Sequence, residues 1–447
     1  MCRSGNDTQV VPYIINREVF HMDKTLYNAY VSILKEELLP AMGCTEPIAV
    51  AYAAAVAARE LGCTPETIEI VVSGNIIKNV KSVVVPNTGG LHGMAAALCA
   101  GIVAGDADRE LQVISNVPRD AHARIKEYME QLDLDIQPSY SELVFDIDVF
   151  EYSGEDVVRL RIINHHTNIV TIEKNGEKLL DLPICESSED HLTDKSCLTI
   201  ENIVAFADCL DVEDVRHLVG EQIRCNMEIA KEGLDGLWGA NIGSVILRRQ
   251  GQTVEKKAGA WAAAGSDARM SGCEKPVMIV SGSGNQGITA SVPVAVFARE
   301  TGATEEQLLK AVALSDLVTI HQKAGIGRLS AYCGAISAGC GAGAGIAYLQ
   351  GGDARAVAHT VVNAIAILSG TICDGAKPSC AAKIAAAVDA GIMGYRMYLH
   401  HKEFQSGEGI VAENVDETIY NVGVLAAQGM QETDQTILRI MQDGQCM

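Results

Sequence analysis

The chain has 447 residues, enough for two or three domains, and carries a formal net charge of −22. Nucleic acids and anionic membranes attract cationic surfaces, and the sequence contains no run of Lys or Arg, so we expect neither as a partner. Fourteen cysteines are too few for a disulfide scaffold, and the N-terminus does not match the pattern of a secretory signal, so we expect reduced thiols and a cytoplasmic location.

The N-terminal part predicts a lead followed by two helices. Residues 1–22 contain only a short apolar run, VVPYII, and are predicted to be disordered. In residues 23–64, apolar side chains recur at helical spacing up to Pro40, which ends the first helix. Thr45 can cap the second helix, which runs to Gly62. We expect both helices to pack on a helical domain formed later in the chain.

Residues 65–190 predict a small α/β domain. Its strand-like runs are TIEIVVS, KSVVVP, LVFDIDVF, VVRLRIIN and NIVTIEKN, and the last closes in an Asn175-Gly176 turn that is typical of hairpins. Two predicted helices, near residues 91–104 and 121–132, interrupt these strands.

Residues 191–447 predict an all-helical domain rich in Ala and Gly, which let helices approach closely. Residues 331–349 carry no charge, but their Ala and Gly content favours a buried helix over a membrane span, which draws mainly on Leu, Ile, Val and Phe. The predicted fold class is therefore α+β, with a large Ala/Gly-rich all-helical domain and a smaller α/β domain.

Three late cysteines, Cys333, Cys373 and Cys380, lie among small residues, so a role in core packing does not readily explain them. Gly375 and Pro378 interrupt any helix between the last two, so the segment is predicted to fold back as a loop that can bring both sulfurs to one cofactor. Three thiolates without a fourth ligand would leave one iron of an iron–sulfur cluster open as a Lewis acid. The alternative is that the three are ordinary packing residues.

Cys44 lies in the sequence GCTEP, at the start of the second predicted helix. The positive end of a helix dipole stabilises a thiolate, so the position predicts a lowered pKa for Cys44. The alternative is a small buried residue beside a helix cap.

Two glycine-bearing turns precede predicted helices and offer free backbone N–H groups to an anion. Residues 281–287, SGSGNQG, follow the apolar run PVMIV and favour a substrate carboxylate over a phosphate, because no dinucleotide-binding βαβ unit accompanies them. The second turn, at Asn87 and Thr88, has a plain helix cap as its alternative explanation.

Several basic side chains are candidates for acid–base or anion-binding roles, although each has a structural alternative: His165, His166, His321 and Lys323. Lys323 and Lys377 also keep open a pyridoxal phosphate (PLP) lyase, which needs a lysine beside a phosphate-binding loop.

The stretch GCTEPIAVAYAAA, the turn SGSGNQGIT and the three late cysteines resemble the L-cysteine desulfidase family, which is related to the α-chain of iron–sulfur L-serine dehydratases. The resemblance covers about residues 22–444. It implies an oxygen-labile 4Fe-4S enzyme that converts L-cysteine to pyruvate, hydrogen sulfide and ammonia without PLP.

By this resemblance Cys333, Cys373 and Cys380 ligate three irons, Cys44 removes the α-proton as catalytic base, and Cys446 is a transient fourth ligand. The resemblance selects Cys333 over Cys340, which follows in the same predicted helix. The residues expected to bind the substrate are Thr45, Glu46, Asn87, Thr88, Ser281, Ser283, Asn285, Gln286, His321 and Lys323.

The mechanism requires Cys44 to lie close to the three late cysteines in the fold. The expected partners are an amino-acid substrate and, as an option, further copies of the chain. Three alternatives remain: an L-serine dehydratase with the same cluster, a PLP lyase, and a non-enzymatic helical protein that binds an anion.

Overall fold

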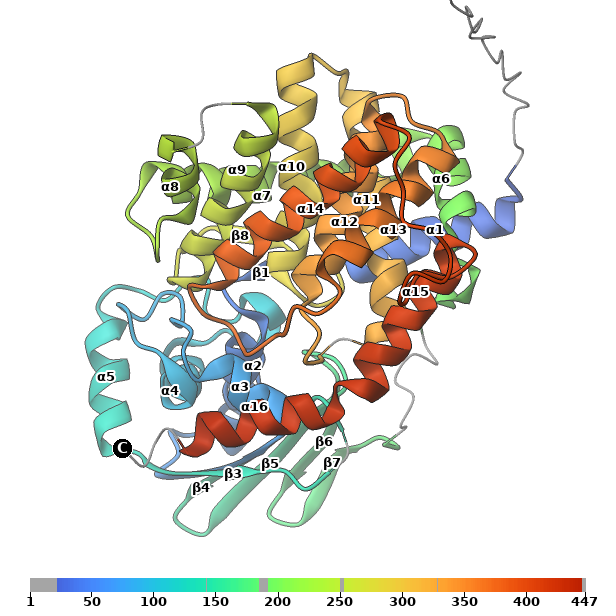
Figure 1. Cartoon of the computed structure of the whole chain (residues 1–447). Helices are drawn as coiled ribbons and strands as arrows, with labels where there is room; N and C mark the ends of the chain where they lie inside the picture. Colours follow the sequence, from blue (N-terminus) through green and yellow to red (C-terminus); the bar gives the residue numbers. More distant parts are fainter. Residues whose placement is uncertain (1–21, 142, 185–191, 250–252, 328, 444–447) are drawn as a thin grey trace, which may run out of the picture.

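The computed structural model describes residues 22–141, 143–184, 192–249, 253–327 and 329–443, which fold into a sheet lobe and a larger helical lobe (Figure 1). This arrangement confirms the predicted α+β class. Residues 1–21 of the predicted lead, and Cys446, lie outside the described residues.

The sheet lobe is built on a six-stranded sheet with the order β3-β2-β4-β5-β6-β7. The strands are β2 (Thr67–Val72), β3 (Asp133–Pro138), β4 (Asp146–Ser153), β5 (Asp156–Ile163), β6 (Ile169–Lys174) and β7 (Glu177–Asp181). Only the β2/β3 pair is parallel. Ile70 is paired with Val149, which is paired with Leu160, and all three are buried, so one face of the sheet supplies apolar core.

Four helices belong to this lobe: α2 (Thr45–Leu61), α3 (Gly74–Val80), α4 (Gly93–Ala104) and α5 (Ala121–Gln131). The Ala-rich α2 packs on α4, β4 and β5, and Gly101 allows α4 to approach closely, because a Cβ there would lie 2.1 Å from the carbonyl oxygen of Ala51. The structure therefore differs from the expectation that both N-terminal helices pack on the helical lobe. Only α1 (Lys24–Glu37) does so, with Tyr30 against Phe206 at 5.2 Å between ring centroids.

One predicted strand is wrong, and five helices and strands lack a counterpart among the expected ones. The run KSVVVP forms no strand, since Val84 makes only an isolated bridge to His92. Val83 and Val85 are buried in the core, and burial rather than strand pairing accounts for the valines at these positions. Helix α3 and the strands β1 (Pro40–Met42), β3, β7 and β8 (Pro276–Met278) were not predicted. The predicted turn at Asn175-Gly176 is confirmed between β6 and β7.

The helical lobe surrounds α12 (Gly334–Leu349), which packs on α10, α11, α13 and α14. The other helices of this lobe are α6 (Ile200–Cys209), α7 (Arg216–Asp235), α8 (Ile242–Arg249), α9 (Val254–Met270), α10 (Gly284–Thr301), α11 (Glu305–Ile326), α13 (Ala354–Leu368), α14 (Cys380–Leu399), α15 (Val415–Val424) and α16 (Gln431–Asp443). Small residues set the spacing: a Cβ on Gly343 would lie 2.6 Å from the carbonyl oxygen of Gly391. No described helix combines the length and apolar character needed to cross a membrane.

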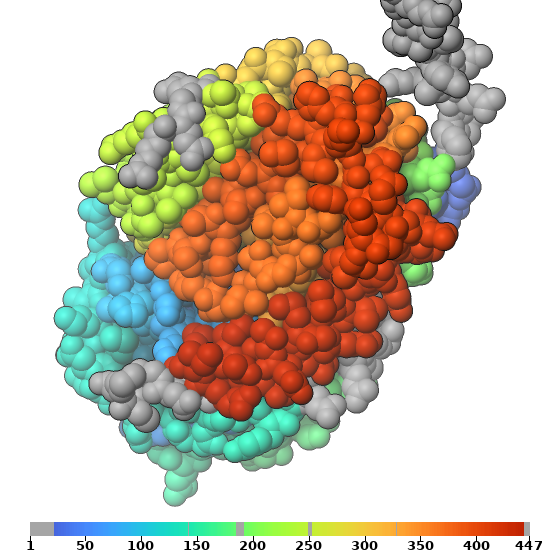
Figure 2. Space-filling view, viewed as in Figure 1, coloured from blue at the N-terminus to red at the C-terminus, as the bar shows by residue number. Residues whose placement is uncertain are grey.

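Two features join the lobes. The short strands β1 (Pro40–Met42) and β8 (Pro276–Met278) pair antiparallel, and each leads directly into a turn that precedes a helix. From the other end of the chain, α16 returns to the sheet lobe, where Asp434 pairs with the buried Lys78 at 2.6 Å and Leu438 contacts Gly74 (Figure 1). On the face in Figure 2, this C-terminal segment (red) lies between the helical lobe (orange) and the sheet lobe (teal).

Candidate functional site

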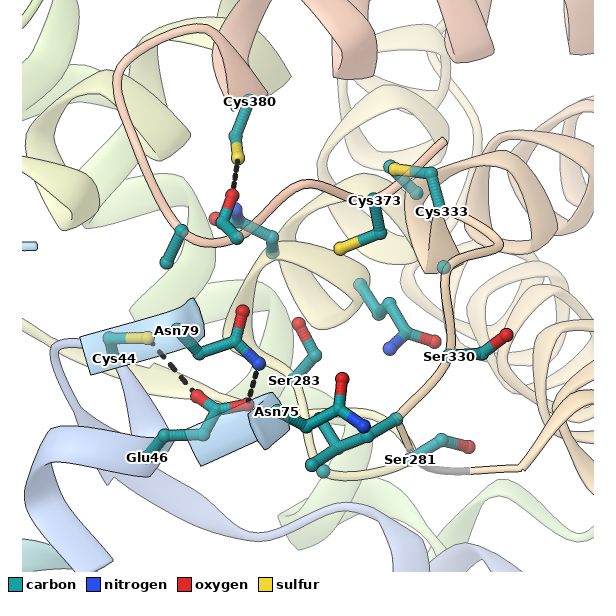
Figure 3. Close-up of a pocket in the computed structure, with 18 of the residues that line it drawn as sticks. Cys44, Glu46, Asn75, Asn79, Ser281, Ser283, Ser330, Cys333, Cys373 and Cys380 are labelled. Atoms are coloured by element: carbon teal, nitrogen blue, oxygen red, sulfur yellow. Dashed lines mark hydrogen bonds between the residues drawn. The ribbon is translucent and has the colours of Figure 1, made fainter. Parts of the chain in front are cut away.

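A pocket of about 840 Å³, including the space at its mouth, lies where the lobes meet (Figure 3). The β1–β8 pair brings the start of α2 beside the turn before α10, while the start of α12 and the loop before α14 form another wall. Helix α3 of the sheet lobe supplies Asn75, Lys78 and Asn79.

Four helices begin at this pocket, and none of them has a side-chain cap among the described residues. They are α2, α10, α12 and α14, and their N-cap residues are Cys44, Ser283, Cys333 and Ser379. Of the other helices, six are capped by the side chains of Asp23, Thr199, Thr253, Thr304, Asp353 and Asn414, while α3, α4, α5 and α7 also lack a side-chain cap within the described ranges. Free N–H groups and the positive ends of four helix dipoles therefore converge here, which favours negative charge in the pocket.

The three late cysteines lie on one wall of the pocket (Figure 3). Backbone pairing holds two of them together: the Cys333 N–H donates to the Thr371 oxygen at 3.1 Å, and the Cys373 N–H donates to the Ala331 oxygen at 2.6 Å. Cys380 follows at the first residue of α14, after a loop that reverses at Gly375 with a φ of 95°, as the sequence predicted.

Electrostatics at this wall disfavour three bare thiolates. Burial, followed by the charge of Cys373, raises the pKa of Cys333 to about 12. Burial also raises the pKa of Cys380, and the charge of Cys373 adds to it. A cationic group bound between the thiolates would relieve both effects.

The three thiols have the chemistry of iron–sulfur cluster ligands. In the described ranges, no group of three or more His, Cys, Asp or Glu side chains could hold a metal ion directly. Thiolates, however, are the ligands that iron–sulfur clusters use, and a cluster distributes them over several irons. Cys340 is buried within α12 and is not among the described lining residues, so it has the position of a core residue.

Cys44 lies at the pocket in contact with Glu46 (Figure 3). Its thiol donates to Glu46 Oε2 at 3.1 Å, and Asn79 Nδ2 donates to Glu46 Oε1 at 3.2 Å. The hydroxyl of Thr45 lies 3.0 Å from both Glu46 Oε2 and the Gly282 oxygen, so it ties α2 to the turn before α10. These contacts fix the orientation of the carboxylate.

The predicted lowering of the Cys44 pKa is wrong for this structure. Burial raises the pKa of Cys44 well above its ordinary value, and the charge of Glu46 adds to the increase, while Arg269 opposes it. Loss of hydration therefore outweighs the helix dipole, which was the only effect visible in the sequence. The raised pKa favours the neutral thiol, whose Sγ donates to Glu46 Oε2.

The turn at residues 281–283 has φ values of 47° at Ser281 and 79° at Gly282, and it leads into α10. Ser281, Ser283, Asn285 and Gln286 all line the pocket. The amide of Gln286 packs against Gly334 at the start of α12, where a Cβ would lie 2.8 Å from Gln286 Cδ.

The structure does not bring four of the predicted substrate-binding residues to the described pocket lining. Thr45 is one of them, and its hydroxyl contacts Glu46 and the Gly282 oxygen instead. Asn87 donates to the Ile114 oxygen at 2.8 Å and so ties its turn to a distant segment. Thr88 donates to the Val85 oxygen at 2.7 Å and so stabilises its own turn. His321 Nε2 lies 2.8 Å from Asp416 Oδ1. Of the other basic candidates, Lys323 and His166 line the pocket, whereas His165 and Lys377 are not among the described lining residues.

Sequence reasoning missed several pocket residues, including Asn75, Lys78, Asn79, Arg269 and Tyr332. The first three come from α3, a helix too short for its pattern to be detected. Arg269 was detectable in principle, because it is a charged residue at the end of the buried, Ala-rich segment AWAAAGSDARM.

Comparison with known proteins places these features in a family context. A family model described as serine dehydratase alpha chain matches residues 108–439, a range that contains the three late cysteines and the turn before α10 but not Cys44 or Glu46. A UPF0597 protein of Desulfitobacterium hafniense is 53% identical over 415 residues, which are 93% of this chain and 96% of the relative. A UPF0597 protein of Treponema denticola is 43% identical over 94% of this chain and 99% of the relative. A UPF0597 protein of Lachnoclostridium phytofermentans is 45% identical over 93% of this chain and 100% of the relative.

Proposed function

This chain belongs to the serine dehydratase alpha chain family, and we propose that it is a lyase that eliminates hydrogen sulfide from L-cysteine. The α-proton and the β-thiol leave, and the resulting enamine hydrolyses to pyruvate and ammonia. The observation that carries the proposal is that Cys44 and three cysteines from the other end of the chain line one pocket, where four uncapped helices begin.

We further propose that Cys333, Cys373 and Cys380 hold an oxygen-labile 4Fe-4S cluster. When bound, the cluster supplies an open iron that acts as a Lewis acid on the substrate. The three side chains lie so close together that a thiolate at Cys373 raises the pKa values of Cys333 and Cys380. This mutual repulsion of thiolates supports a role as ligands of a cationic group.

Cys44 is the proposed base for the α-proton. Its thiol must first release its own proton, and Glu46 Oε2, at 3.1 Å, is placed to accept it. Asn79 and Thr45 hold the carboxylate in that orientation. The free N–H groups at the start of α10 and the hydroxyl of Ser283 then face the negative end of the substrate.

L-Serine is the second candidate substrate, since the description of the matching family model favours it. The same residues would serve, with hydroxide leaving in place of hydrosulfide. The thiol-lined wall favours L-cysteine, because a substrate sulfur binds iron more readily than a hydroxyl does.

Anaerobic reconstitution with iron and sulfide tests the proposal. We expect about four irons and four sulfides per chain, together with release of pyruvate and sulfide from L-cysteine that is lost on exposure to air. A much higher kcat/KM for L-serine would assign the second substrate. Iron-loaded protein that releases pyruvate from neither amino acid would refute the lyase proposal and favour an anion-binding protein. An aldimine absorbance band, removed by borohydride, would instead indicate PLP.

A further inference from the structure

Arg269 is a buried cation at the pocket that the reaction described above does not use. It lies in the last turn of α9, is 2% exposed, and lines the pocket. Its Nε is buried and has no hydrogen-bond partner in the part of the chain that the structure describes. Burying an unsatisfied guanidinium donor is unfavourable, so the position indicates an anionic ligand.

Gly284 fixes where Arg269 lies. A Cβ at Gly284 would lie 2.4 Å from Arg269 Nε and 2.8 Å from Cζ, so only glycine leaves room for the guanidinium over the first residue of α10. The guanidinium and the free N–H groups of α10 therefore supply donors to the same part of the pocket. A planar fork beside a helix N-terminus matches a carboxylate, which accepts two hydrogen bonds side by side.

Buried acceptors at the same pocket complement these donors. Asn75 Oδ1, Asn285 Oδ1 and Gln286 Oε1 are buried, line the pocket, and have no partner among the described residues. An ammonium group has three N–H donors and no acceptor, so it can satisfy such oxygens. Donors for a carboxylate and acceptors for an ammonium together describe the head group of a free α-amino acid.

We propose that Arg269 binds the α-carboxylate of the substrate and restricts the site to α-amino acids with a free carboxyl group. The inference rests on the proposed function for the identity of the substrate. Binding of the α-amino and α-carboxylate groups can nevertheless be measured without turnover. Arg269 also lies near enough to Cys44 to favour its thiolate. A guanidinium that served only Cys44 would leave ligand binding unchanged when it is replaced.

The experiment uses L-alanine, which carries the head group but has no leaving group, and L-alaninamide, which lacks the carboxylate. Calorimetric titration of the full-length chain, after anaerobic reconstitution, measures the affinity for both. We expect Arg269→Gln to weaken L-alanine binding by about 10- to 100-fold and to leave L-alaninamide binding unchanged. Arg269→Lys should recover part of the loss, and Arg299→Gln, on the outer surface of α10, should have no effect.

Three results would overturn the inference: equal affinity of the unmodified chain for both ligands, no binding of L-alanine, or unchanged binding in Arg269→Gln. If Arg269→Gln fails to fold, Gly284→Ala displaces the guanidinium without removing its charge and should weaken L-alanine binding in the same way. Arg269-dependent binding without pyruvate release from L-cysteine or L-serine would refute the proposed lyase and leave the inference intact.

Discussion

The thiol of Cys44 donates a hydrogen bond to Glu46 Oε2 over 3.1 Å, and both side chains face the pocket that contains the three late cysteines (Figure 3). Neither residue alone is suited to remove the α-proton of the substrate. The buried thiol holds its proton tightly, and the carboxylate is already occupied by the donors Cys44, Thr45 and Asn79. We therefore propose that the pair functions as a unit, in which Cys44 faces the substrate and Glu46 accepts the proton of the thiol.

Replacing Cys44 tests the base directly. We expect Cys44→Ser to lower kcat by about 10²- to 10⁴-fold, because a serine hydroxyl is a far weaker acid than a thiol and cannot relay the proton. Iron content should not change. Cys63→Ser, at the exposed far end of the same helix, is the matched control and should retain activity. Full activity in Cys44→Ser would remove this residue from the mechanism.

Replacing Glu46 separates the charge of the carboxylate from its role as proton acceptor. The negative charge of Glu46 disfavours the Cys44 thiolate, so Glu46→Gln should lower the pKa of Cys44. Alkylation of Cys44 by iodoacetamide, quantified by peptide mass mapping in iron-free protein, should then begin at lower pH than in the unmodified chain. Turnover should nevertheless fall, because the amide of the variant would not accept a proton. An alkylation profile displaced to higher pH would contradict this account.

The cluster ligands are tested by a cysteine series. Cys333→Ala, Cys373→Ala and Cys380→Ala should each lower iron affinity by more than about 10-fold, since every ligand contributes to holding the cluster. Cys340→Ala removes a thiol from the interior of α12 and should keep its iron. Iron and sulfide counts after anaerobic reconstitution decide the matter. Normal iron in Cys333→Ala, with loss in Cys340→Ala, would reverse the assignment.

The loop that carries Cys373 and Cys380 depends on Gly375. Its φ is 95°, and a Cβ there would lie 2.4 Å from the carbonyl oxygen of Lys78 on α3. We expect Gly375→Ala to cost about 1–2 kcal/mol for the backbone conformation alone and to displace the loop, so that less iron is retained. Gly370→Ala is the control in the same connection, because a Cβ there meets nothing within 4 Å. Equal iron content in the two variants would show that the loop tolerates the change.

The sequence predicts the features of this fold that depend on neighbouring residues, and it does not predict those that depend on segments far apart in the chain. The loop at Gly375 and Pro378, the turn at residues 281–283 and the start of α2 are local features, and each is where the sequence indicated. The predicted cap is wrong, because the N-cap residue of α2 is Cys44 and not Thr45, and no described side chain caps the helix. Helix α3 carries no local signal, and Arg269 carries only its charge within an Ala-rich segment. Both become pocket residues only when α16 and the β1–β8 pair hold the lobes together. The pKa of Cys44 is hardest to predict, since burial by distant segments outweighs the helix dipole.

A buried carboxyl in the helical lobe predicts how stability depends on pH. Asp316 on α11 is 0% exposed, and burial raises its pKa to about 8. Gln222 Nε2 donates to its Oδ1 at 2.8 Å, while Asp316 Oδ2 and Gln222 Oε1 have no partner in the described chain. Protonation removes the buried negative charge and turns Oδ2 into a donor.

The sign of the effect follows from where each state binds the proton. An unfolded aspartate loses its proton near pH 3.9, so between about pH 4 and pH 8 the folded chain holds a proton that the unfolded chain does not. The free energy of unfolding must therefore fall as pH rises through that window, by at most about 6 kcal/mol from this residue.

Asp316→Asn keeps a neutral group that can donate to Gln222 at every pH. We expect its melting temperature to match that of the unmodified chain near pH 5 and to exceed it at about pH 8.5, where the variant should be more stable by a few kcal/mol. Asp389→Asn, on the surface of α14, is the control and should leave the pH dependence unchanged. Parallel melting curves for Asp316→Asn and the unmodified chain across this range would show that Asp316 is not protonated in the fold.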